Sequence, residues 1–142
     1  LIILRVPSIY GPGRLGLQRI NAGRPVVREE EANPGNRIHV EDLAACCVCA
    51  LDENVPPGIY NVGDGTHYSS TWFVNTVARL AKIKPPPTVT KMEADTTFEP
   101  ARLSFINESR ILNTTKMRTI LGFTPRYKDP EKGIAASMNI KI

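Results

Sequence analysis

The chain has 142 residues, of which 42% are hydrophobic and 23% charged, a composition ordinary for a globular domain with its own core. Its net charge of +4 comes from 18 Lys and Arg against 14 Asp and Glu, and the basic residues are spread along the sequence. This spread argues against nucleic-acid binding, and the lack of a long apolar stretch or secretory leader argues against a membrane partner. We therefore expect a cytoplasmic protein that attracts small anionic molecules weakly.

The chain opens on an apolar run that predicts a buried strand. Residues 1–6 are rich in Ile and Leu, and such a run is typical of a strand covered on both faces in a parallel sheet. Pro7 lacks a backbone donor and predicts the end of the strand. Gly11-Pro12-Gly13 predicts a turn, which leaves Arg14 beyond the carboxyl end of the strand. Open α/β sheets bind their ligands at that end.

Helical and extended patterns alternate through the next part of the chain. We predict a short helix at 15–22, a polar loop at 26–36 and an extended piece at 37–40. Glu41 and Asp42 suit the first turn of a helix that ends near Asp52. The spacing of its apolar residues predicts a buried face made of Leu43, Cys47, Ala50 and Leu51.

The second half continues the alternation. Residues 59–62 predict a buried strand, and Ser69 and Ser70 suit the N-cap of a helix at 71–82. Residues 88–104 give no clear pattern. Ser109 predicts the start of a further helix that Gly122 ends, and a last helix is predicted at 130–138. Strands alternating with helices predict an α/β fold with parallel strands.

Cys46, Cys47 and Cys49 allow two interpretations. The C-x-x-C spacing of Cys46 and Cys49 is compatible with redox or metal chemistry. A zinc site needs four ligands, however, and a redox pair favours an exposed, electropositive helix start. The surrounding Ala and Val residues favour three small buried side chains in a reducing compartment.

Five motifs, spread from end to end of the chain, resemble the extended short-chain dehydrogenases, a family of NAD(P)-dependent epimerases and dehydratases. In chain order, these are Arg5-Val-Pro-Ser-Ile-Tyr-Gly-Pro-Gly-Arg14, Arg37-Ile-His-Val-Glu-Asp-Leu-Ala44, Gly58-Ile-Tyr-Asn-Val-Gly63, Asn107-Glu-Ser-Arg-Ile-Leu-Asn113 and Leu121-Gly-Phe-Thr-Pro-Arg-Tyr127. Gly35-Asn36-Arg37 stands where the sugar-nucleotide epimerases usually have Arg-Asp-Phe or Arg-Asp-Tyr. The sequence therefore resembles a less characterised branch of the family.

The resemblance implies a fold, a cofactor and a missing part. Residues 1–142 match the C-terminal part of a Rossmann-type doubly wound parallel sheet plus a small α/β substrate-binding subdomain. The complete enzyme would use NAD or NADP and a small-molecule substrate, and a homodimer is compatible with this. The sequence contains neither the glycine-rich phosphate turn nor the Tyr-x-x-x-Lys pair of the family. We therefore expect the dinucleotide-binding half and the catalytic pair to lie upstream of Leu1.

The resemblance also assigns candidate site residues. Pro7, Ser8 and Ile9 match positions near the nicotinamide, although Pro7 could equally serve only to end a strand. Tyr10 and Arg14 match a loop that faces the substrate, where a guanidinium could pair with a phosphate or carboxylate.

Three further polar residues are weaker candidates for a functional site. Arg37 and Arg110 are candidates for substrate binding. The alternative is that they are solvated arginines on the surface, which are more common. The residues themselves favour a cap or a core hydrogen bond for His39 rather than the role of a base.

Three functional interpretations remain open at this stage. The first is the substrate-side portion of an NAD(P)-dependent epimerase or dehydratase-like enzyme, inactive by itself. The second is a non-catalytic small-molecule-binding module that retains this scaffold without the cofactor half. The third is a truncated product that cannot fold alone. The sequence upstream of Leu1 would distinguish them.

Overall fold

The computed structural model describes residues 1–142, and its strands and helices confirm an α/β fold with parallel strands. The strands are β1 (Ile2–Arg5), β2 (Ser8–Tyr10), β3 (Val26–Val27), β4 (Arg37–His39), β5 (Gly58–Asn61) and β6 (Thr88–Val89). The helices are α1 (Leu17–Asn21), α2 (Val40–Cys49), α3 (Ser70–Ala81), α4 (Lys91–Thr97), α5 (Pro100–Asn107), α6 (Thr115–Thr119) and α7 (Pro130–Ser137), with a 3₁₀ turn at Glu29–Glu31.

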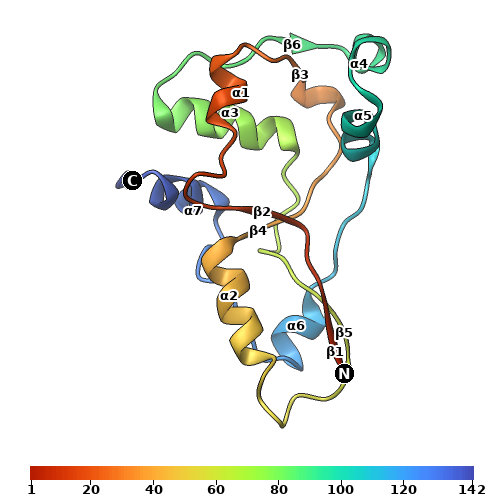
Figure 1. Cartoon of the computed structure of the whole chain (residues 1–142), viewed down its shortest axis with the longest axis vertical. Helices are drawn as coiled ribbons and strands as arrows, with labels where there is room; N and C mark the ends of the chain where they lie inside the picture. The colour runs from red at the N-terminus through yellow and green to blue at the C-terminus, as the bar shows by residue number, and fades with distance from the viewer.

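The strands pair in three separate two-stranded parallel sheets, β1 with β5, β2 with β4 and β3 with β6. In Figure 1, α1, α3, β3, β6, α4 and α5 gather at one end of the molecule. β1, β5, α2 and α6 lie at the other end, and β2 and β4 run between the two. The chain thus crosses repeatedly between two small bodies of structure.

Each body has its own core. We call the body with β1, β5, α2 and α6 the lower body, as it is drawn in Figure 1. Its core, the lower core, contains Ile38, Cys46, Tyr60, Val62, Met117, Leu121 and Phe123. The other body, with α1, α3, α4 and α5, is the upper body. The upper core contains Tyr10, Leu15, Ile20, Val77, Ala78 and Ile134. Neighbouring residues Ile38, His39 and Tyr10 lie on the paired strands β2 and β4, so these strands join the two cores.

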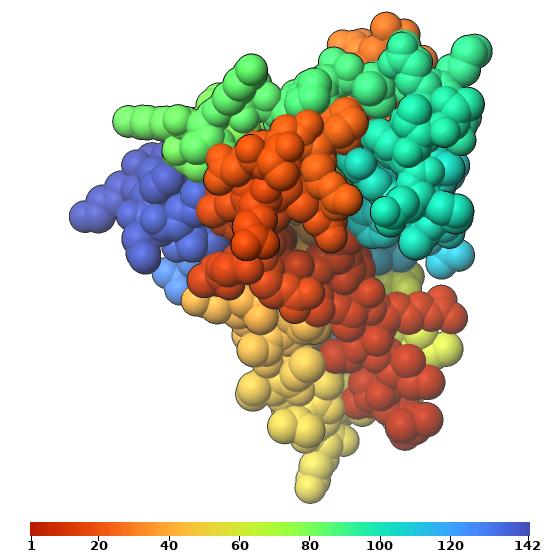
Figure 2. All heavy atoms as spheres, turned by 45° about the horizontal axis from the view of Figure 1, so that its top comes forward, coloured from red at the N-terminus to blue at the C-terminus, as the bar shows by residue number.

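The prediction that the first strand is covered on both faces is wrong. Ile2 and Leu4 pack against the lower core, whereas Ile3 is 44% exposed. β1 pairs only with β5, in a register that places Ile3 beside Ile59, which is 42% exposed. Figure 2 shows the red first strand at the molecular surface. One face of this parallel sheet is therefore open to solvent. β2, which follows Pro7 directly, was not predicted at all.

Helix α2 begins where the sequence predicted, but its buried face is different. The imidazole Nδ1 of His39 accepts the backbone N–H of Glu41 at 3.1 Å, which caps the helix as expected of that residue. Asp42 and Cys46 are the buried residues, whereas Cys47 is exposed and Leu51 is 80% exposed. Asp42 is held inside because its two carboxylate oxygens accept the backbone N–H groups of Arg126 and Tyr127.

The three cysteines therefore differ in their surroundings. Cys46 is buried, Cys49 is partly buried and Cys47 is exposed, so the expectation of three buried thiols is wrong for Cys47. All three are free, and no group of three or more His, Cys, Asp or Glu side chains is placed to hold a metal ion. No helix has the length and apolar character needed to cross a membrane.

Two predictions fail in the loops. Val26 and Val27, assigned to a polar loop, form β3 because they pair with Thr88 and Val89 far along the chain. The helix predicted from Ser109 begins only at Thr115.

The other predicted caps agree with the structure. The Ser69 hydroxyl accepts the Trp72 backbone N–H at 3.0 Å and starts α3. Gly122, with φ of 78°, lies just after α6, and α7 starts at Pro130 as predicted.

Candidate functional site

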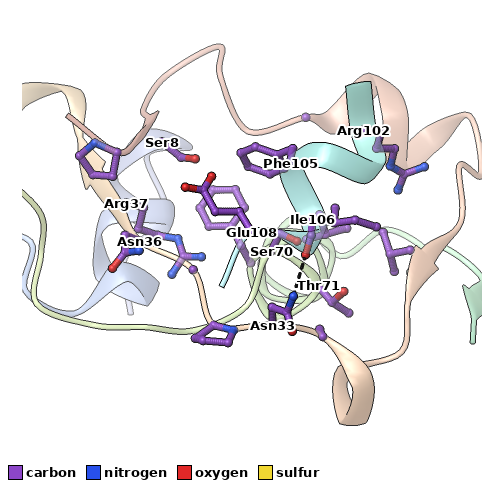
Figure 3. A pocket seen from close by; sticks show the side chains of 18 of the residues that line it. Ser8, Asn33, Asn36, Arg37, Ser70, Thr71, Arg102, Phe105, Ile106 and Glu108 are labelled. Carbon is purple, nitrogen blue, oxygen red and sulfur yellow. Dashed lines mark hydrogen bonds between the residues drawn. The ribbon is translucent and has the colours of Figure 1, made fainter. Parts of the chain in front are cut away.

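A cavity of about 1110 Å³ lies between the upper and lower bodies of the molecule. Its wall is built from β1 and β2, α1, the loop before β4, the start of α3, and α5. Figure 3 shows Ser8 and Arg37 on one side, Arg102 on the other, and Phe105 between them. The seven residues that the sequence suggested for a site all belong to the lining: Pro7, Ser8, Ile9, Tyr10, Arg14, Arg37 and Arg110.

Pro7, Ser8 and Ile9 line the cavity where the chain passes from β1 to β2. Ser8 is exposed, and its hydroxyl is drawn toward the open space in Figure 3. Ile9 packs against the lower core, so its wall position is rigid. The segment offers the cavity backbone groups and a hydroxyl, and its role toward a cofactor stays a prediction.

Tyr10 belongs to the core more than to the site. Its side chain is 3% exposed and packs edge-on against His39 and Phe73, with ring centroids 5.2 and 5.3 Å away. The hydroxyl is buried against Gly133 of α7 and has no hydrogen-bond partner. Burial raises the pKa of Tyr10, so the phenol is neutral. We therefore do not retain the Tyr10 hydroxyl as a substrate contact.

Arg37 is the most deeply placed cation in the wall. It is 5% exposed, and its Nη2 donates to the carbonyl oxygens of Tyr68 and Ser69 at 2.7 and 3.3 Å. The guanidinium carbon lies 5.4 Å from the ring centre of Phe73. Burial lowers the pKa of Arg37, although the guanidinium remains charged. The side chain is therefore fixed in one position.

The other terminal nitrogen of this guanidinium has no hydrogen-bond partner. Nη1 of Arg37 is buried and has no hydrogen-bond partner, and the same holds for Oδ2 of Asp64. The two side chains attract each other but form no ion pair within 4 Å. Both atoms are enclosed by the protein, so Arg37 adds positive charge to the wall of the cavity without presenting Nη1 to a ligand.

Arg14 and Arg110 are exposed at the margin of the cavity. Arg14 follows the predicted turn, which its backbone N–H closes by donating to the Gly11 carbonyl at 3.0 Å. Arg110 forms an exposed ion pair with Glu108, with Nε and Oε1 3.0 Å apart. Both side chains are exposed to solvent, unlike that of Arg37.

Sequence reasoning missed the wall that α5 provides. Arg102, Phe105 and Ile106 lie on this helix, which begins inside the region 88–104 where no pattern was found. The side-chain amide of Asn33 donates to the Ile106 and Asn107 carbonyls, both at 3.2 Å, and thereby ties the loop before β4 to α5 (Figure 3). Pro100 at the helix start was the available signal, since Pro is favoured at the first helical position.

A site for a dinucleotide pyrophosphate is not formed by the turn at 11–14. Such a site needs free backbone amides at a glycine-rich turn that opens a helix. Here the turn 11–14 uses its own amide internally, and the following helix, α1, has five residues. What the cavity offers is a wall of hydroxyl, amide and guanidinium groups around an apolar centre.

Neither a protein-family model nor a curated protein sequence matches the chain. Solved structures do match. A functionally unknown conserved protein from Silicibacter pomeroyi aligns with 98% of this chain at 27% identity and a TM-score of 0.83. The human epimerase family protein SDR39U1, solved with NADPH, aligns with 97% at 15% identity and a TM-score of 0.78. ADP-L-glycero-D-manno-heptose-6-epimerase from Helicobacter pylori aligns with 97% at 19% identity and a TM-score of 0.71.

The fold is that of the C-terminal part of Rossmann-like epimerase structures. This chain spans about half of the proteins it matches, covering 48% of the Silicibacter and human chains and 43% of the Helicobacter chain. Nearly all of this chain is thus accounted for by less than half of each relative.

Proposed function

We propose that the chain is the substrate-side portion of an NAD(P)-dependent epimerase or dehydratase-like oxidoreductase, and that it is not catalytic by itself. The observation that carries this proposal is the alignment of 97–98% of the chain with under half of the matched proteins, the human one solved with NADPH. The open face of the β1–β5 sheet supports it, because parallel sheets are normally covered on both faces.

In this proposal the cavity between the two bodies is the substrate site. Arg37 attracts an anionic group of the substrate from the wall of the cavity, and Arg14 and Arg110 add positive charge at the margin. Pro7, Ser8 and Ile9 form the wall beside the nicotinamide. NAD or NADP would supply hydride transfer when bound, whereas the residues of this chain orient the substrate and exclude water from one side of it.

A second candidate is a small-molecule-binding module without catalysis. It is favoured by the sequence, which has neither Tyr-x-x-x-Lys nor a glycine-rich phosphate turn, and by the fact that this chain alone encloses a cavity. In this case Arg37 attracts an anionic ligand and no redox step follows.

Calorimetric titration with NAD and NADP distinguishes the two candidates. We expect negligible binding to the 142-residue chain and micromolar binding to the protein made from the complete reading frame. Micromolar binding by the 142-residue chain would show that the cofactor site does not depend on another half. No binding by either protein favours the second candidate.

A further inference from the structure

Helix α5 forms one wall of the cavity but belongs to neither core. It has no buried residue, and the apolar residues that form or pack against the two cores all lie outside 88–112. The same helix places Phe105 and Ile106 in the lining of the cavity. Helix α3, which lines the cavity too, is different, because Val77 and Ala78 bury it in the upper core. Since local opening occurs in weakly packed segments, α5 can move without disturbing either core.

Hydrogen bonds of two side chains tie α5 to the rest of the molecule. The side-chain amide of Asn33 donates to the carbonyls of the last two residues of α5, both at 3.2 Å, where a helix lacks donors of its own. Nη2 of Arg102 donates to the Pro25 carbonyl at 2.6 Å, and the guanidinium carbon lies 3.8 Å from the ring centre of Phe98. Water can replace hydrogen bonds in such exposed or half-buried places at little cost, so these contacts can break and re-form.

Extended backbone on both sides of α5 gives it two points about which it can turn. Glu99, just before the helix, has φ of −63° and ψ of 147°, and Glu108, just after it, has φ of −65° and ψ of 129°. Beyond these points the chain is held. The Lys91 backbone N–H at the start of α4 donates to Glu31 at 2.9 Å, and the Asn36 side chain binds the backbone that follows Glu108. A movement of α5 is thus confined to a short segment.

Phe105 exposes an aromatic ring inside the cavity. The residue is 56% exposed although it belongs to the lining, and in Figure 3 its ring extends from α5 toward Ser8. Phe73 and Val74 of α3 line the same cavity and are half-buried. Eight of the lining residues are Lys or Arg and two are Glu, so the apolar surface lies in surroundings that attract anions. A ligand with both an anionic and an apolar group complements this arrangement, because covering the ring with apolar atoms is favourable.

We propose that residues 99–109, with α5 at their centre, are a lid that closes Phe105 onto an apolar group of the substrate. The hydrogen bonds of Asn33 and Arg102 hold the lid in the position seen here. The apolar contact with Phe105 stabilises the closed position. This inference rests on the proposed function, because it takes the cavity as the substrate site, and it adds that the substrate carries an apolar group beside its anionic one.

Amide hydrogen exchange of the 142-residue chain tests the movement of the lid. We expect the α5 amides to exchange at least about tenfold faster than those in the middle of α3. Asn33→Ala should speed exchange in α5 by a further factor of about five and leave α3 unchanged. Asn75→Ala is the matched control, because the Asn75 amide donates to Glu29 at 3.2 Å outside the cavity, and it should leave α5 unchanged. Equal protection of α5 and α3, or no effect of Asn33→Ala on α5, overturns the proposal.

Binding of 2-naphthoate, with acetate as the anion that lacks an apolar group, tests what the lid covers. Naphthoate should slow α5 exchange at least about fivefold at saturation, and acetate should bind at least about tenfold more weakly. Phe105→Ala should weaken naphthoate binding about tenfold or more, whereas Met92→Ala, an exposed apolar residue outside the cavity, should not. Wild-type affinity in Phe105→Ala, equal binding of the two anions, or binding without slower α5 exchange overturns the proposal. The assay needs neither cofactor nor activity, so its failure is distinct from that of the proposed oxidoreductase.

Discussion

The imidazole ring of His39, at the end of β4, contacts both α2 and α7. Nδ1 accepts the Glu41 backbone N–H, and Nε2 lies 3.1 Å from the Ser137 hydroxyl of α7. Burial lowers the pKa of His39 below its ordinary value of 6.5, an effect that Glu41 and Asp42 oppose and Arg126 reinforces. The neutral ring is therefore the form that folding favours.

We expect this residue to make stability depend on pH. Because the folded-state pKa is depressed, its contribution is complete above about pH 6.5 and is lost as the pH falls through the folded value. Protonation at Nδ1 also removes the cap of α2, worth about 1 kcal/mol. Thermal melts from pH 7.5 to 5 should show the loss in the wild type.

His39→Asn is the comparison variant for this prediction. Asn is a good N-cap without a titrating group, so the variant should be less stable at pH 7.5 but lack the loss of stability below about pH 6.5. An unchanged pH profile in the variant would assign the loss to another group.

At the scale of elements, the packing of α7 against β2 depends on Gly133. A Cβ added there would overlap the Tyr10 hydroxyl and lie 3.0 Å from the ring carbon that bears it. Gly133 is inside a helix, so the backbone accepts Ala and the cost is steric. The Tyr10 hydroxyl has no hydrogen bond to lose.

A double-mutant cycle between Gly133 and Tyr10 tests this contact. Gly133→Ala should destabilise the protein by about 1–3 kcal/mol, the usual cost of overpacking. Tyr10→Phe alone should be nearly neutral, and it should recover part of the loss in the double variant because it removes the overlapping oxygen but keeps the ring carbons that lie 3.0 and 3.1 Å from the added Cβ. Denaturant unfolding gives the four free energies. Additive effects would mean that the helix moves away from β2 instead.

At the scale of the whole molecule, the open face of the β1–β5 sheet is an exposed apolar surface. Ile3 and Ile59 lie side by side on it, while Leu4 and Tyr60 occupy the covered face. Exposed apolar sheet faces favour association with another surface. The 142-residue chain should therefore self-associate at high concentration.

Replacing Ile3 and Ile59 together by Thr should reduce this association without lowering the melting temperature, because Thr suits strands and neither side chain packs in the core. Analytical ultracentrifugation over a range of concentrations measures it. Leu4→Thr is the control from the covered face and should cost about 2 kcal/mol of stability. A wild type that remains monomeric at all concentrations contradicts the prediction.

Local chemistry was sufficient to place much of the fold from the sequence. Ser69 caps α3, Pro130 opens α7 and Gly122 follows α6 because each effect acts within a few residues. The alternation of strands and helices likewise predicted the parallel pairing, and the motifs around residues 7–14 led to the cavity wall.

The failures have long-range causes. Ser109–Leu112 does not become helical because the Asn36 side chain donates to the Arg110 carbonyl and accepts the Leu112 backbone N–H. Val26 and Val27 become a strand because residues more than sixty positions away pair with them. Periodicity could not tell which of Cys46 and Cys47 faces inward, because Asp42 and Cys46 have the same four-residue spacing as Leu43 and Cys47, and the packing of the helix decides which pair is buried.

The sequence by itself determined the class of fold, most of the caps and turns, and the residues on the β1–β2 side of the cavity. Only the tertiary structure decided that Arg37 is buried with Nη1 lacking a hydrogen-bond partner, that Tyr10 turns to the core, and that α5 forms the opposite wall. Caps and turns are set by neighbours in the chain. A cavity and its charge depend on segments that meet only after folding, as β2, α1 and α5 do.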